Sequence, residues 1–205
     1  MNKPPIQLIL WDFNGVTVVG DHKLTAKYFG KKHGTPWQDA FAVFYTKYFN
    51  QLALNKIDEK TAWQQPIREL GWAEDWQHVR SWHLSHQQLR KTVVAYVQSL
   101  RRRGYQNILF TKNFEPWVMY QEKRLHFTRY FDDIVNTQKY NLPKASEKTI
   151  KYICRRYGVA PGQIIHIDDQ KQNLTQAQEL GVHTVLYRTF AQMRREVSKI
   201  IRKYS

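Results

Sequence analysis

The sequence predicts a doubly wound α/β fold, a parallel Rossmann-like sheet with helices on both faces and a helical cap inserted after the first strand. Short apolar runs alternate with amphipathic stretches from residue 89 onward, and parallel strands need crossover connections of this kind. Glycines stand where three of the amphipathic stretches should end. Residues 21–86 contain no convincing strand and hold several tryptophans, which indicates a separate helical insertion.

Five short apolar runs bounded by turn signals predict the strands of the sheet. In chain order they are Ile6–Trp11, Asn107–Thr111, Asp133–Asn136, Gln163–Ile167 and His183–Tyr187. The stretches between and after them predict helices over Leu89–Arg103, Glu115–Leu125, Ser146–Tyr157, Asn173–Leu180 and Phe190–Arg202. Gly104, Gly158 and Gly181 would provide C-terminal caps for three of these helices, since glycine tolerates a left-handed backbone.

The inserted segment carries its own helix signals. Asp39–Gln51 and Glu59–Leu70 have the pattern of amphipathic helices, and Asp58 is a suitable N-cap for the second of them. An insertion at this point would lie above the carboxyl ends of the strands, where open α/β sheets bind ligands. We therefore expect a core formed by residues 1–20 and 87–205 and a cap formed by residues 21–86, with the cap tryptophans as its hydrophobic core.

Composition excludes several classes of protein. A length of 205 residues suits one domain with an insertion. The single cysteine, Cys154, excludes an intramolecular disulfide and a multi-cysteine zinc site. No apolar run approaches the roughly 20 residues that span a bilayer, so we expect no membrane partner. The first residues lead into a short strand rather than a signal-peptide core, which predicts a cytoplasmic location.

The net charge of +15 is unusual for a chain of this size. A field of this sign attracts polyanions and steers phosphorylated ligands toward a cleft. The basic residues are scattered, and no helix-turn-helix, zinc-finger or RNA-recognition signature accompanies them. A nucleic-acid partner is therefore an open alternative, and a small phosphorylated substrate is the favoured one.

Polar side chains stand at or just beyond the carboxyl ends of four predicted strands. Asp12 follows the first strand, Thr111 ends the second, and Lys144 lies in the loop beyond the third, before a helix expected to begin at Ala145 or Ser146. The fourth strand is followed by the pair Asp168-Asp169. A carboxylate nucleophile, a hydroxyl donor, an ammonium group and carboxylates for a hard divalent cation are the groups that phosphate chemistry requires.

These four motifs, in this order, resemble the haloacid dehalogenase-like hydrolases, most of which are magnesium-dependent phosphatases. The resemblance covers nearly the whole chain and is most specific from Tyr130–Val135 through Lys144 to Ile167–Asp169 and Leu180–Thr184. Residues 21–86 resemble the helical cap that this family inserts just after its first motif. The resemblance implies a phosphatase with a Mg²⁺ cofactor.

The resemblance also implies a role for each matched residue. Asp12 would attack phosphorus and form an aspartyl-phosphate, Thr111 would hold a phosphoryl oxygen, and Lys144 would neutralise charge. The Mg²⁺ ligands would be Asp12, Asp169 and the backbone carbonyl of Asn14. Behind these ligands, Asp168 would orient Lys144 and Asn173 would occupy the place of the polar residue after the acidic pair. The phosphate would bind among Phe13, Asn14, Thr111, Lys112, Asn113 and Lys144.

Asn14 departs from the family pattern. Phosphatases of the family carry a second aspartate at this catalytic position, which protonates the leaving oxygen and then activates water. An amide has no proton to exchange near pH 7, so help worth about 10²–10⁴-fold should be missing. Three alternatives stay open: a slow or specialised phosphatase, a dehalogenase-type hydrolase, and a catalytically impaired protein that binds a phosphorylated ligand or nucleic acid. Dehalogenases of the family typically carry tyrosine at this position.

Other polar residues are expected to have simpler roles. His166 lies inside a predicted buried strand and should be a hydrogen-bonded core histidine, and Cys154 should be a small core residue. Four cap residues could each reach toward a substrate, and the sequence does not choose among them: Lys32, Arg80, His83 and His86.

Overall fold

The computed structural model describes residues 5–144 and 146–204. Its main sheet has five parallel strands in the order β5-β4-β1-β6-β7. Each strand begins and ends within two residues of its predicted bounds: β1 (Leu8–Trp11), β4 (Gln106–Thr111), β5 (Asp133–Asn136), β6 (Ile164–Asp168) and β7 (His183–Leu186). The extension of β6 to Asp168 matters for the site, because it brings the first residue of the acidic pair into the sheet.

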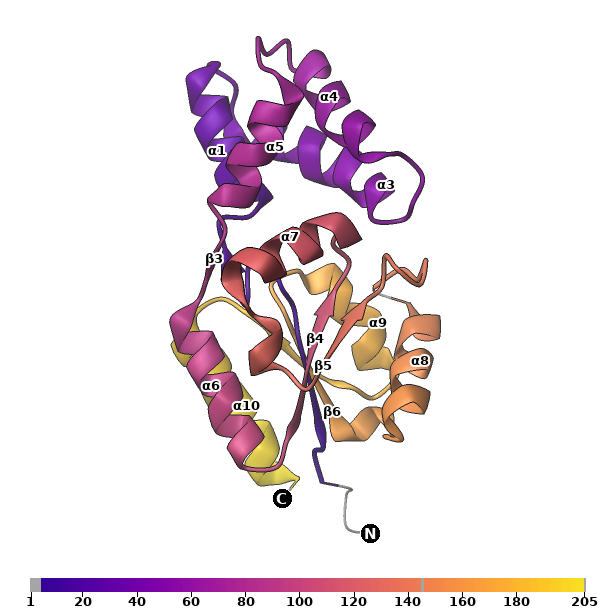
Figure 1. Cartoon of the computed structure of the whole chain (residues 1–205). Helices are drawn as coiled ribbons and strands as arrows, with labels where there is room; N and C mark the ends of the chain where they lie inside the picture. The colour runs from indigo at the N-terminus through magenta and orange to yellow at the C-terminus, as the bar shows by residue number, and fades with distance from the viewer. Residues whose placement is uncertain (1–4, 145, 205) are drawn as a thin grey trace.

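Helices cover both faces of this sheet, which confirms the predicted fold class. The helix α6 (Lys91–Arg102) and the C-terminal helix α10 (Phe190–Lys203) lie on one face, and α8 (Glu147–Tyr157) and α9 (Lys171–Glu179) lie on the other (Figure 1). Strand β1 alternates between the two layers. Ile9 and Trp11 join the buried cluster of α6 and α10, whereas Leu8 and Leu10 join that of α8 and α9.

The other core elements are α7 (Glu115–Leu125), two short 3₁₀ turns, Thr128–Tyr130 and Pro161–Gln163, and a small antiparallel ribbon of β2 (Val18–Val19) and β3 (Gln88–Leu89). Residue 145, named above as a possible helix start, lies outside the described residues, and Ser146 caps α8. Leu89 was expected to begin a helix but belongs to β3, so that prediction is wrong. Two-residue strands carry no periodic signal, and only the pairing of β2 with β3 forms them.

The inserted segment is helical between β2 and β3. Its elements, which together we call the cap, are α1 (His22–Lys32), α2 (Trp37–Phe41), the π-helix η1 (Ala42–Phe49), α3 (Asn50–Leu52), α4 (Glu59–Glu69) and α5 (Trp76–Ser85). Asp58 accepts a hydrogen bond of 2.7 Å from the Thr61 N–H, as expected for the N-cap of α4. The helix predicted over Asp39–Gln51 is confirmed, because α2, η1 and α3 follow one another without a break, but the sequence did not predict that its centre winds as a π-helix.

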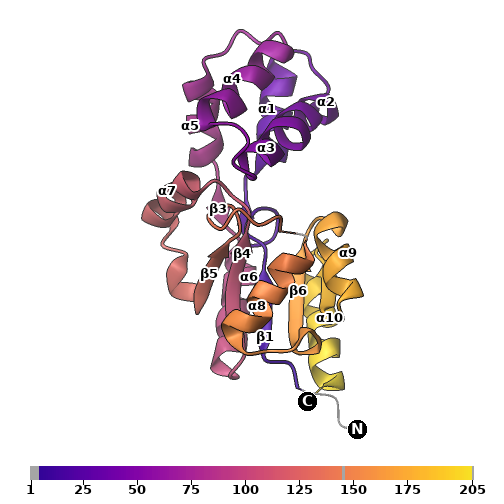
Figure 2. The ribbon, with the colours of Figure 1, turned by 90° about the vertical axis from the view of Figure 1, so that its right-hand side faces the viewer.

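The cap has its own hydrophobic core, in which Trp63 and Trp72 are buried. It lies above the carboxyl ends of the strands (Figure 2), and hydrogen bonds join it to the core. Asn55 Nδ2 donates to the Gln138 carbonyl over 3.1 Å and Gln138 Nε2 donates back to Asn55 Oδ1 over 2.5 Å. On α7, Trp117 Nε1 donates to the Glu59 carboxylate of the cap. Within the described part of the chain, no helix is long and apolar enough to span a bilayer.

His83 is a buried polar residue of the cap core, and both of its ring nitrogens have hydrogen-bond partners. Its Nδ1 lies 2.7 Å from Thr25 Oγ1, and its Nε2 lies 3.1 Å from Gln87 Nε2. Burial, together with the nearby charge of Arg80, lowers the pKa of His83 to about 3. The imidazole is therefore neutral in the folded protein, whereas an unfolded chain would protonate it below its ordinary pKa of about 6.5.

This difference predicts that the protein loses stability as the pH falls below about 6.5. The unfolded state then binds a proton that the folded state does not take up until near pH 3, which costs up to about 1.4 kcal/mol per pH unit. Urea unfolding followed by tryptophan fluorescence at pH 7, 6 and 5 measures the slope. His83→Gln should reduce it and the exposed control His86→Gln should not; equal slopes in all three proteins would contradict the assignment.

Candidate active site

The polar residues meet where β1 lies between β4 and β6. The chain order reverses at this point, and open α/β sheets bind ligands outside such a reversal. Asp12 follows β1 directly, and its backbone N–H donates to the Ile167 carbonyl of β6 over 3.0 Å. Thr111 ends β4 and Asp168 ends β6. The sheet register therefore places three of the predicted side chains at one edge.

Lys144 lies at the centre of the cluster. Its Nζ donates to Asp12 Oδ1 and, over 2.7 Å, to Asp168 Oδ2, and its side chain is only 1% exposed. Burial alone would lower the pKa of Lys144, but the two carboxylates outweigh it and raise the pKa. The lysine is therefore a fixed positive charge between the first and last motifs.

The pKa values of the two carboxylates that bind Lys144 are shifted in opposite directions. Burial raises the pKa of Asp12 well above its ordinary value, although Lys144 opposes the shift. For Asp168 burial would also raise the pKa, but the charge and hydrogen bond of Lys144, together with His166 and the Gln170 N–H, outweigh it and lower the pKa. Asp168 also accepts hydrogen bonds from Asn173 Nδ2 at 3.0 and 3.1 Å and from the Gln170 N–H at 2.8 Å. Asp168 is thus fully engaged in holding Lys144.

Asp169 has the properties of a cation ligand. Burial and the charge of Asp168 raise its pKa to about 6, and its buried Oδ1 has no hydrogen-bond partner among the described residues. Oxygens of Asp12, Asp168 and Asp169 lie within 4.8 Å of one another. Both oxygens of Asp168 are hydrogen-bonded, whereas Lys144 holds only one oxygen of Asp12. Asp12 and Asp169 are therefore the carboxylates available to a hard divalent cation, and the site fits one.

The loop after Asp12 is shaped for close approach to Asp169. Gly15 has a positive φ of 83°, and a Cβ there would lie 2.3 Å from Asp169 Oδ2. Arg90, at the return from the cap, donates over 3.1 Å to the carbonyls of both Gly15 and Val16. The Phe13 side chain is buried against Phe127, so only its backbone can face the site.

Asn14 links the first motif to the second. Its Nδ2 donates to Asn113 Oδ1 over 3.1 Å, and the Asn113 N–H donates to Thr111 Oγ1 over 3.2 Å. Lys112 points toward the cap, where its Nζ donates to Asn50 Oδ1 over 3.0 Å and lies 5.3 Å from the ring centre of Tyr45. Burial, and then the charge of Lys144, lower the pKa of Lys112. Seven of the ten predicted site residues line one cavity: Asp12, Asn14, Thr111, Lys112, Asn113, Asp169 and Asn173. Lys144 and Asp168 are buried beside Asp12 without lining it, and the Phe13 side chain packs on Phe127.

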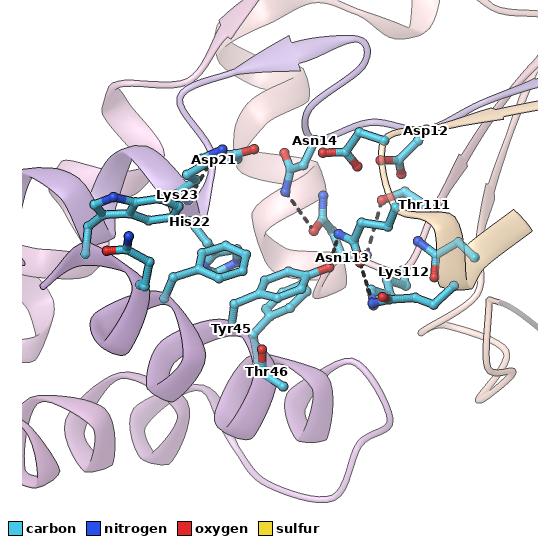
Figure 3. Close-up of a pocket in the computed structure, with 18 residues that line it drawn as sticks. Asp12, Asn14, Asp21, His22, Lys23, Tyr45, Thr46, Thr111, Lys112 and Asn113 are labelled. Atoms are coloured by element: carbon cyan, nitrogen blue, oxygen red, sulfur yellow. Dashed lines mark hydrogen bonds between the residues drawn. The ribbon is translucent and has the colours of Figure 1, made fainter. Parts of the chain in front are cut away.

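The cavity has a volume of about 470 Å³ and lies between the core motifs and the cap. In Figure 3, Asp12, Asn14 and Thr111 face it from the core, across from His22, Tyr45 and Thr46 of the cap. The cap and its entry loop contribute nine lining residues: Asp21, His22, Lys23, Trp37, Gln38, Phe41, Tyr45, Thr46 and Phe49.

None of the four cap residues singled out from the sequence lines this cavity. Lys32 pairs with Glu74, Arg80 pairs with Glu59, His83 is hydrogen-bonded inside the cap core, and His86 stacks on Trp82. Two features of the sequence could have identified the residues that do line the cavity. Asp21, His22 and Lys23 follow the first motif closely, and Phe41, Tyr45 and Phe49 recur at a spacing of four residues.

His166 corrects another expectation. It is buried in β6 as predicted, but neither ring nitrogen has a hydrogen-bond partner within the described ranges. Its Nε2 lies 3.7 Å from Asp168 Oδ2, and burial lowers its pKa to about 3. The carboxylate that could have accepted its hydrogen bond is held by Lys144 and Asn173 instead.

Comparison with known proteins decides the family. The family profile of the haloacid dehalogenase-like hydrolases matches residues 9–187, from β1 to just beyond β7. The chain belongs to the haloacid dehalogenase-like hydrolases. Bifunctional epoxide hydrolase 2 of Rattus norvegicus is 21% identical over 119 residues, which are 55% of this chain. The match covers only 21% of the rat protein, so the chain spans about a fifth of that relative's length.

Solved structures of haloacid dehalogenase (HAD) proteins share the fold. A predicted HAD-like hydrolase from Porphyromonas gingivalis has a TM-score of 0.72 at 20% identity, with 96% of this chain and 98% of that chain covered. A HAD family enzyme from Bacteroides thetaiotaomicron, in complex with magnesium and inorganic phosphate, has a TM-score of 0.67 at 18% identity, with 89% and 94% covered. A dehalogenase has a TM-score of 0.70 at 13% identity, with 90% and 85% covered.

In this HAD-like chain, Lys144 should be essential to folding stability. Lys144→Gln leaves two carboxylates facing each other without a cation, and breaking a buried ion pair costs about 3–5 kcal/mol. The exposed control Lys139→Gln, which loses only a surface pair with Glu115, should stay close to the unmodified protein. Adding Asp12→Asn to Lys144→Gln should recover part of the loss. Urea unfolding gives the free energy of unfolding of all four proteins. Equal losses of this free energy in Lys144→Gln and Lys139→Gln would contradict the central role of Lys144.

Proposed function

We propose that this chain is a Mg²⁺-dependent phosphatase that acts on a small phosphorylated metabolite through an aspartyl-phosphate on Asp12. The observation that carries the proposal is the buried Asp12–Lys144–Asp168 arrangement beside a cavity that Asp12 lines together with Thr111 and Asp169. A buried ammonium beside a nucleophilic carboxylate is suited to the transfer of an anionic group. The similar Bacteroides enzyme, solved with magnesium and phosphate, supports this substrate chemistry.

Mg²⁺ bound by Asp12, Asp169 and the Asn14 carbonyl would supply positive charge that favours ionised Asp12 and neutralises the phosphate. The chain's own residues do the rest. Lys144 holds one oxygen of Asp12 and leaves the other for attack on phosphorus. The Thr111 hydroxyl, the Asn113 amide and the Lys112 ammonium are the donors available to the phosphoryl oxygens.

The chemistry has two steps. An oxygen of Asp12 forms a bond to phosphorus while the bond from phosphorus to the leaving oxygen breaks, and the electron pair departs on that oxygen. Water then attacks the aspartyl-phosphate, releases inorganic phosphate and restores the Asp12 carboxylate. Both steps would profit from a proton carrier at position 14. The Asn14 amide donates a hydrogen bond to Asn113 but neither releases nor takes up a proton as an acid or base near pH 7.

The metal assignment predicts that Asp169 is required for Mg²⁺ binding. Calorimetric titration of the unmodified protein with MgCl₂ should show one site, and Asp169→Asn should weaken it at least tenfold because one of two free carboxylates is lost. Asp133→Asn is the matched control, since that carboxylate lies on the surface with Arg156. Equal affinities in the unmodified protein and Asp169→Asn would mean that the metal ligands are misassigned.

The nature of residue 14 predicts a dependence on the leaving group. Leaving groups of low pKa, such as nitrophenolate, depart without a proton, so the unmodified protein should turn them over slowly and barely hydrolyse alkyl phosphates. Asn14→Asp should raise alkyl phosphate hydrolysis by roughly 10²-fold or more. Steady-state kinetics on both substrate classes measures the change, and mass spectrometry of the unmodified protein looks for phosphorylated Asp12.

Two outcomes would contradict this account. If Asn14→Asp gains nothing on any phosphate ester and no adduct forms on Asp12, a binding or dehalogenase-type function replaces the phosphatase. If the unmodified protein already hydrolyses alkyl phosphates rapidly, another residue supplies the proton and the explanation of Asn14 is wrong.

A further inference from the structure

The cap side of the cavity is a wall of rings. Five side chains with aromatic or imidazole rings line it, from α1, α2 and η1: His22, Trp37, Phe41, Tyr45 and Phe49. The phosphate-binding groups lie on the opposite, core side, with Asp12, Thr111 and Lys112. A ligand whose phosphate meets Asp12 would therefore place the rest of its structure against the rings.

Three of these rings form an ordered row. Phe41 and Tyr45 stack with ring centres 4.9 Å apart and planes 15° apart, and Tyr45 and Phe49 stack at 5.2 Å and 19°. Phe49 in turn stacks on Trp117 of the core at 5.7 Å and 17°. The last two rings of the row belong to η1, and π-helical turns are rare and frequently found at functional sites. The wall is thus held in place before any ligand arrives, which reduces the entropic cost of binding.

His22 adds an unpaired polar group to this wall. It is buried, its ring centre lies 4.4 Å from that of Phe49, and neither of its nitrogens has a hydrogen-bond partner among the described residues. Its neighbour His83, at 4.5 Å, has both nitrogens paired. Burial, together with His83, lowers the pKa of His22 well below its ordinary value, so the ring is neutral and offers one donor and one acceptor.

An unpaired buried polar group costs about 1–3 kcal/mol, and a polar atom on the ligand would remove that cost. A simple alkyl chain could fill the apolar space but could not pair with His22. A ring with a polar substituent satisfies both features of the wall, because aromatic pairs gain about 0.5–1.5 kcal/mol beyond the area they bury.

The core side of the cavity also favours an aromatic ligand, for a separate reason that concerns the leaving group. With Asn14 in place of a proton carrier, the leaving oxygen must depart as an anion. A phenol has a pKa near 10, about six units below the value of about 15.7 for water, which an alkyl alcohol resembles. A phenolate is therefore a far better leaving group here than an alkoxide.

Resting on the phosphatase function proposed above, we propose that the substrate is an aryl phosphate: the monoester of a small phenol whose ring lies against Phe41, Tyr45 and Phe49. A polar substituent on that ring hydrogen-bonds to His22. A cavity of about 470 Å³ is within the range of small-ligand sites and holds one such ring with its phosphate. In the transfer step the electron pair of the breaking bond to phosphorus leaves on the phenolate oxygen, which takes its proton from water.

Binding of phosphonates separates ring recognition from leaving-group reactivity, because their carbon–phosphorus bond is not hydrolysed. Calorimetry with Mg²⁺ present compares benzylphosphonate, cyclohexylmethylphosphonate and inorganic phosphate. We expect benzylphosphonate to bind at least fivefold more tightly than its saturated analogue. Equal affinities of the two, with inorganic phosphate bound, would overturn the aryl inference and leave the phosphatase proposal standing. Failure of inorganic phosphate to bind would overturn both.

Two phenylalanines of η1 provide a matched pair of variants. Phe49 lines the cavity, whereas Phe44 is equally buried but packs between Trp63 and Trp72 inside the cap. In Phe49→Leu the two phosphonates, benzylphosphonate and its saturated analogue, should bind with nearly equal dissociation constants. In Phe44→Leu the tighter binding of benzylphosphonate should be preserved. An unchanged preference in Phe49→Leu would overturn the placement of the ring.

The hydrogen bond to His22 has its own test. His22→Phe keeps a ring and removes both nitrogens. The tightest of the three hydroxybenzylphosphonates should then bind roughly fivefold to tenfold more weakly, while benzylphosphonate should be unaffected. Equal weakening of both ligands would show that His22 acts only through cap packing and would overturn its role as a ligand-binding residue.

Discussion

The buried ammonium of Lys144, shared by Asp12 and Asp168, is the interaction on which the site depends. Removing three charges from water is costly. The other oxygen of Asp168 offsets part of this cost, because Asn173 and the Gln170 N–H donate hydrogen bonds to it. These groups come from β1, β6, α9 and the loop before α8. The position of Lys144 therefore depends on the register of β1 against β6 and on the packing of α8 and α9 against the sheet.

The cap is attached to the core beside the residues that this cluster positions. Lys112 follows Thr111 and donates to Asn50 of the cap, and Gln170 follows Asp169 and donates to Tyr45 over 2.5 Å. The hydrogen bonds between cap and core thus begin one residue away from Thr111, the proposed phosphate ligand, and from Asp169, the proposed metal ligand. Movement of the cap would alter the site directly, which links closure to the arrangement of the reacting groups.

Asn14 fits the charge balance of this edge of the sheet. Asp12, Asp168 and Asp169 already place three carboxylates within 4.8 Å, against the single ammonium of Lys144 in direct contact. A fourth carboxylate at position 14 would add repulsion, whereas the amide is neutral and donates to Asn113. The hydrogen bond of the amide ties the first motif to the second. Under the proposed phosphatase function the same substitution would sacrifice acid–base catalysis, a trade between stability and activity that is common at active sites.

Local sequence patterns predict the five strands, the helices beside them and the polar residues at the strand ends. Apolar runs, glycine caps and strand-end motifs each lie within a short segment, so they can be recognised without the tertiary structure. They are sufficient to predict Asp12, Thr111, Lys144 and Asp168-Asp169 as one cluster. Tertiary packing, by contrast, determines four features that no local pattern predicts: the π-helical turn, the β2–β3 ribbon, the unpaired nitrogens of His22 and His166, and the choice of cap residues that face the cavity. Each depends on which distant surface a segment packs against, and the periodicity of one segment carries no information about its partner.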